Sequence, residues 1–127
     1  MNMRLPADKY DVLAVERLVQ AGPESALPHL AELLTWMQDL NWPVAQVLQP
    51  FLAEIGLPLE PYIRDVLATD DEGWKFWTIS AVVGESLPLA RVFEPELRRM
   101  ASSPSPGERQ EGLQERALEI LRVTQRS

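Results

Sequence analysis

The chain has 127 residues, a formal net charge of −7 and no cysteine, and 46% of its residues are hydrophobic. This length and hydrophobic content fit one domain, 1–127, with an ordinary core. The acidic charge argues against nucleic acid and anionic membranes as partners, and the absence of cysteine excludes disulfides and thiolate chemistry. We expect a cytoplasmic protein.

The first predicted helix covers 11–21 and has no partner helix before it. Val12, Val15 and Leu18 fall on one face of this helix, and Asp11 is a candidate N-cap. We therefore expect a single helix that caps the N-terminal end of the fold.

Three later segments open with a proline in near-identical patterns. Pro28, Pro61 and Pro95 are 33 and 34 positions apart, and each is followed two positions later by an aliphatic residue. Proline is tolerated in the first turn of a helix, and this period is typical of helical solenoids. The pattern predicts three first helices, each opened by its proline.

Glycines recur at a similar spacing and are expected to end the second helix of each pair. Gly22, Gly56 and Gly84 each follow an apolar-periodic segment, where a left-handed residue commonly ends a helix. Each repeat is thus predicted as a helix opened by proline, a turn, and a second helix closed by glycine. The expected fold class is all-α: an α-solenoid of about three antiparallel helix pairs plus the N-terminal capping helix.

The second helices are predicted at 43–55 and 72–83, and the last helix at 107–124. In 43–55 the apolar residues recur at intervals of three and four, which gives one buried stripe. The apolar segment 87–93 interrupts the repeat, and we expect a short helical turn packed on the body. A homodimer formed through this segment is an open alternative. The composition of 102–107 predicts a flexible loop.

The most distinctive residues lie in the two turns within the helix pairs. One interpretation is a tryptophan-acidic ridge that contacts another protein, for which a basic surface would be complementary. The other is packing of the tryptophans between repeats, with Asn41, Asp70 and Asp71 as helix N-caps. The candidate partner-binding residues are Trp36, Asp39, Asn41, Trp42, Asp70, Asp71, Trp74, Lys75 and Trp77.

No catalytic, cofactor-binding or metal-binding residue is predicted. His29 is the only histidine, which is insufficient for a typical zinc site, and the chain lacks a P-loop, a nucleophile elbow and a dinucleotide fingerprint. Ser80 is expected to form a hydrogen bond within its own helix. The alternative is a small hydrolase or lyase that uses carboxylates near Trp42 and Trp74. It requires a pocket where ionisable groups with perturbed pKa values converge.

Three motifs resemble a family of short bacterial proteins of unknown function whose fold is similar to HEAT repeats. They are Leu5–Asp11 (Leu-Pro-Ala-Asp-Lys-Tyr-Asp), Leu40–Ala45 (Leu-Asn-Trp-Pro-Val-Ala) and Trp74–Trp77 (Trp-Lys-Phe-Trp). The resemblance covers nearly the whole chain and supplies no catalytic residues. It implies a single HEAT-like domain and, by analogy, a non-enzymatic protein-binding module, either a scaffold or an immunity protein that neutralises a toxin. We expect a monomer or a weak homodimer.

Overall fold

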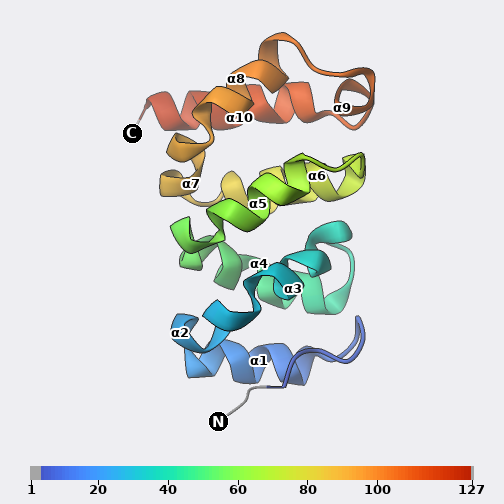
Figure 1. Cartoon of the computed structure of the whole chain (residues 1–127), viewed down its shortest axis with the longest axis vertical. Helices are drawn as coiled ribbons and strands as arrows, with labels where there is room; N and C mark the ends of the chain where they lie inside the picture. Colours follow the sequence, from blue (N-terminus) through green and yellow to red (C-terminus); the bar gives the residue numbers. More distant parts are fainter. Residues whose placement is uncertain (1–3, 127) are drawn as a thin grey trace.

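The computed structural model describes residues 4–126, and the regular structure of this part is entirely helical (Figure 1). Its α-helices are α1 (Val12–Ala21), α2 (Pro23–Ala26), α3 (Leu30–Leu34), α4 (Pro43–Ile55), α5 (Glu60–Leu67), α6 (Glu72–Thr78), α7 (Leu87–Val92), α8 (Glu94–Ser102), α9 (Pro106–Gln110) and α10 (Leu113–Gln125). Short 3₁₀ segments are η1 (Leu27–His29), η2 (Thr35–Gln38) and η3 (Leu57–Leu59), and η4 (Ile79–Val83) is a π-helix.

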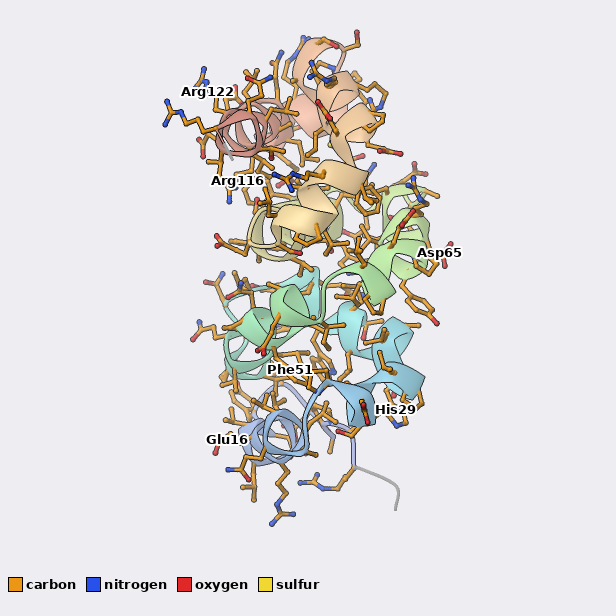
Figure 2. All side chains as sticks on the ribbon, turned by 90° about the vertical axis from the view of Figure 1, so that its left-hand side faces the viewer. Glu16, His29, Phe51, Asp65, Arg116 and Arg122 are labelled. Atoms are coloured by element: carbon orange, nitrogen blue, oxygen red, sulfur yellow. The ribbon has the colours of Figure 1, made fainter. Side chains whose placement is uncertain are left out.

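The helices are stacked in chain order along the long axis of the molecule, in two layers (Figures 1 and 2). Helices α1, α4 and α10 form one layer, in which Glu16, Phe51 and Arg116 lie, and α3 and α5 belong to the other, with His29 and Asp65. Helix α1 packs on α4, α4 packs on η4, and α3 packs on α5. A single cluster of buried apolar side chains runs from Val15 to Leu121 between the layers. Stacking therefore buries the apolar stripe that each helix carries.

Equivalent positions of the predicted repeat are buried in all three units. Leu30, Ile63 and Leu97 are at most 3% exposed. Pro61 and Pro95 are the second residues of α5 and α8, as the pattern predicts. The prediction for Pro28 is wrong, because this proline lies in the 3₁₀ segment η1 and α3 begins only at Leu30. Its ring fits a first turn but not the interior of a helix continuous with α2.

Gly22 and Gly56 have positive φ angles of 98° and 70°, as expected of glycines just after a helix, whereas Gly84 does not. Gly84 has a φ of −67° and donates its N–H to the carbonyl of Ile79. A Cβ at this position would lie 2.9 Å from Arg116 Nη2 and 3.1 Å from Ile120 Cδ1. The glycine therefore permits the close approach of α10, and the prediction of a left-handed residue here is wrong.

Two predicted helices are each divided in the structure. The segment 72–83 changes from the α-helix α6 to the π-helix η4 after Thr78. Gln49 Nε2 donates to the carbonyl of Ala81 at 2.7 Å, so a side chain of α4 satisfies part of η4. Gly112, with a φ of 85°, separates α9 from α10 inside the predicted helix 107–124. The hydroxyl of Ser80 is buried without a hydrogen-bond partner, so its predicted bond within the helix is absent.

The segment 87–93 forms helix α7 and is packed on the body, as predicted. Leu89, Ala90 and Phe93 are buried, and Leu87 is 36% exposed. Most of the apolar surface of this segment is therefore used inside the molecule, which leaves Leu87 as its exposed leucine for any contact between two copies.

Candidate functional site

The turns within the helix pairs gather along one edge of the molecule, on the right in Figure 1. This tryptophan-turn edge consists of residues 36–42, residues 68–77 and residues 103–110, the last of which comprise α9 and the loop before it. Helix α6 contacts η2 on one side and α9 on the other. The two turns predicted from sequence are thus neighbours in space.

The first turn is held by its own aromatic and polar side chains. Trp36 and Trp42 form an edge-to-face pair with ring centroids 5.9 Å apart, and both are half-buried against the core. The Asp39 carboxylate accepts a hydrogen bond of 2.8 Å from the backbone N–H of Asn41. Trp42 occupies the N-cap position of α4, so the predicted capping role of Asn41 is wrong. The exposed Asn41 side chain is left at the surface.

The second turn is tied to the first by a tryptophan. Trp74 Nε1 donates to the carbonyl of Leu34 at 3.0 Å, which links α6 to the end of α3. Asp71 is the N-cap of α6 and accepts from the Trp74 backbone N–H at 3.0 Å, so its predicted capping role is confirmed. Asp70 is exposed and precedes the cap, which makes its predicted capping role wrong. The Trp77 ring packs edge-to-face on Phe76 at 5.2 Å.

Lys75 is buried, with 6% of its surface exposed. Its ammonium lies 3.1 Å from Glu72 Oε1, and an ion pair compensates for burying the charge. Gly107 of α9 lies directly over this glutamate, since a Cβ on the glycine would lie 2.9 Å from Glu72 Cδ. Helix α9 therefore packs against the glutamate of this α6 ion pair, and the lysine itself is buried rather than exposed for a partner.

A buried carboxylate at this edge escapes the sequence-based prediction. Glu108 is 2% exposed and accepts two hydrogen bonds from Arg99, of 3.0 and 2.6 Å. The Arg99 guanidinium, with the Ser105 backbone N–H, lowers the pKa of Glu108 to about 2. Glu108 also completes a capping box with Ser105, and the Ser-x-x-Glu spacing of a capping box is the sequence signal that reveals it.

We predict that acid weakens the fold through Glu108. Because the folded-state pKa is lowered from 4.5 to about 2, its contribution is present above pH 4.5 and is lost as the pH falls through about 2. Glu108→Gln should lower the free energy of unfolding by about 2 kcal/mol at pH 7. Urea denaturation of both proteins across this pH range measures the effect. A difference that stays constant down to pH 2 would contradict the assignment.

A small hollow beside Trp74 is the recess closest to the predicted site. It has a volume of about 170 Å³, and its lining includes Tyr62, Asp65 and Thr69. Asp65 is the one carboxylate in this lining. Across residues 4–126, no group of three or more His, Asp or Glu side chains is arranged to hold a metal ion. The geometry therefore offers an edge of turns and a shallow, mainly apolar recess.

The comparisons with known proteins identify a family. No curated protein matches the chain. Within the described residues, no helix is long and apolar enough to cross a membrane. The family described as "Domain of unknown function (DUF5071)" matches residues 4–121, nearly the whole chain. The protein therefore belongs to the DUF5071 family.

Proposed function

We propose that the protein is a non-enzymatic protein-binding module that presents its tryptophan-turn edge to another protein in the cytoplasm. Its helix pairs act as an α-solenoid of HEAT-like repeats, with α1 as the cap. The observation that carries the proposal is the gathering of successive turns along one edge, backed by a continuous core. Turns on a rigid scaffold are common sites of recognition.

The surface of this edge combines exposed polar groups with partly exposed rings. Asn41, Asp70 and Asp71 are exposed, and Trp36 and Trp42 are half-buried beside them. Asp70 has no ion-pair partner among the described residues. An acidic edge with aromatic anchors fits a basic protein surface, as in a scaffold or an immunity protein bound to a toxin.

Positive charge introduced at exposed positions tests this function without disturbing the tryptophan packing. The double variant Asn41→Lys/Asp70→Lys is compared with Glu16→Lys, an exposed position on α1. Each protein is immobilised and incubated with extract of the native host, and retained proteins are quantified by mass spectrometry. A protein that wild type and Glu16→Lys retain equally, but the double variant loses, supports the proposal. Equal retention by all three contradicts it.

The alternative enzyme function has no specific observation in its favour. A hydrolase or lyase near Trp42 and Trp74 requires converging ionisable groups, and the recess beside Trp74 brings in Asp65 as its one carboxylate. Glu108, the carboxylate whose pKa is strongly lowered, already accepts hydrogen bonds from Arg99. The proposed function therefore gives Glu108 a role in folding and needs no catalytic role for Asp65.

A further inference from the structure

The edge opposite the tryptophan turns carries three exposed leucines, each directly before a proline. Leu27, Leu57 and Leu87 are 43%, 48% and 36% exposed, and they are spaced thirty positions apart. Each is the first residue of a helical segment, η1, η3 or α7, and each is followed by a proline. These segments lie along the left edge of Figure 1, which faces the viewer in Figure 2. We call this surface the leucine-proline edge.

These leucines are not needed to fill the core. Two positions after Leu57 and Leu87, Leu59 and Leu89 are fully buried and fill the interior instead. A single exposed leucine on a surface needs no explanation. Leucines that open three successive short helical segments on one edge form a row, and apolar side chains grouped in this way are typical of interaction sites.

A groove runs between the second and third leucine-proline turns. It has a volume of about 500 Å³, and its lining includes Glu54, Leu57, Pro58, Leu87 and Pro88. A neighbouring hollow of about 450 Å³ shares Glu54 with it and extends the recess along α4. The leucines and prolines thus provide apolar walls for an elongated occupant.

Exposed glutamates recur at a similar spacing, just before each leucine in the chain. Glu24 and Glu54 each precede their leucine by three positions and Glu85 precedes Leu87 by two, and all three glutamates are exposed. Glu24 and Glu54 have no ion pair within residues 4–126, and the cation nearest to Glu85 is Arg116, at 4.0 Å. The groove therefore carries two glutamates, of which Glu54 is unpaired and Glu85 is only loosely paired, and this negative charge complements a cationic ligand.

The spacing of the layers matches the repeat of a polyproline II segment. Packed helices are about 8–10 Å apart, and a polyproline II segment advances about 9 Å in each three-residue turn. A ligand in this conformation presents one side chain of each triplet to each successive turn of the stack. Its other positions remain free to carry basic groups toward the glutamates.

We propose that the leucine-proline edge binds an extended, cationic segment of a partner protein in the polyproline II conformation, with an apolar residue at every third position. The ligand's apolar residues rest on Leu57 and Leu87, and its Lys or Arg side chains pair with Glu54 and Glu85. This surface is separate from the tryptophan-turn edge, and the inference does not depend on the function proposed for that edge.

Synthetic peptides test the proposal with the full chain. The probe is a fluorescein-labelled peptide of about five Lys-Pro-Leu triplets, followed by fluorescence anisotropy. One control peptide replaces Lys with Glu, and another replaces Leu with Ser. We expect saturable binding of the Lys-Pro-Leu peptide alone, weakened by added salt. Absence of saturation up to about 1 mM, or equal binding of the three peptides, would overturn the proposal.

Variants locate the peptide on the molecule. Leu57→Ser/Leu87→Ser should weaken binding about tenfold, and Glu54→Lys/Glu85→Lys should weaken it at least as much. Leu118→Ser and Glu16→Lys are matched controls at other exposed positions and should bind as wild type does. Asn41→Lys/Asp70→Lys should also leave peptide binding unchanged, which separates this surface from the tryptophan-turn edge. Equal loss in the control variants, with melting temperatures unchanged, would overturn the assigned location.

Discussion

Replacing Phe93 with alanine should lower the free energy of unfolding by about 4 kcal/mol. Phe93 is fully buried at the junction of α7 and α8, and the Arg64 guanidinium lies 4.7 Å from the centre of its ring. The truncation leaves a cavity where the inserted segment joins the core and removes this cation–π contact. Urea denaturation followed by circular dichroism measures the change.

Leu87→Ala is the matched control for Phe93→Ala within the same inserted segment. Leu87 is 36% exposed, so its truncation should cost less than about 1 kcal/mol. A similar stability for Phe93→Ala and wild type would show that the inserted segment is not packed on the body as described.

Replacing Trp74 with alanine should lower the free energy of unfolding by about 3 kcal/mol. The indole is packed against the core, and its Nε1 donates the hydrogen bond to Leu34 that joins the two turns. Trp74→Phe keeps an aromatic ring but loses that bond and the pyrrole part of the indole, so it should cost about 2 kcal/mol, less than Trp74→Ala. Chemical denaturation of both variants gives the two values.

Trp77 provides the comparison for Trp74 on the same helix. It is half-buried, and its ring packs on the neighbouring Phe76 instead of joining the two turns. We expect Trp77→Ala to cost less than Trp74→Ala. If Trp74→Ala left stability unchanged, the ring would be free for a partner, and the packing described for the turns would be wrong.

The sequence predicts the regular helices best, because their pattern is local. In α4, the residues Val44, Leu48 and Leu52 of the predicted stripe are buried, and Gly56 ends the helix with a positive φ. The packing of segment 87–93 on the body is also predicted, since a run of apolar residues is unstable in solvent. These features depend only on neighbours along the chain.

The sequence predicts less well the features that depend on a second element. Gly84 resembles a helix-ending glycine, but its missing Cβ makes room for Arg116, 32 positions later. The predicted helix 107–124 includes Gly112, whose left-handed φ of 85° separates α9 from α10 in the structure. Asp11 occupies the N-cap position of α1 but bonds Arg4 instead of capping the helix.

At the candidate site, too, the sequence predicts poorly what depends on a second element. The position of the two turns follows from the repeat, whereas the use of each side chain does not. Lys75 is typical of an exposed residue by type, yet in the fold it is buried beside Glu72, against which α9 packs. Arg99 and Glu108 are nine positions apart on different helices, so their pairing appears only once α9 folds back.

Hydrogen exchange of the complex formed with a retained partner tests the binding account most directly. The account predicts slower exchange at the amides of Asp39–Trp42 and of residues 70–77 when the partner is bound, with α1 unchanged. Slower exchange confined to other surfaces, such as α8 and α10, would contradict the tryptophan-turn edge as the binding surface. Protection at residues 54–58 and 85–88 alone would contradict it too, while supporting the leucine-proline edge.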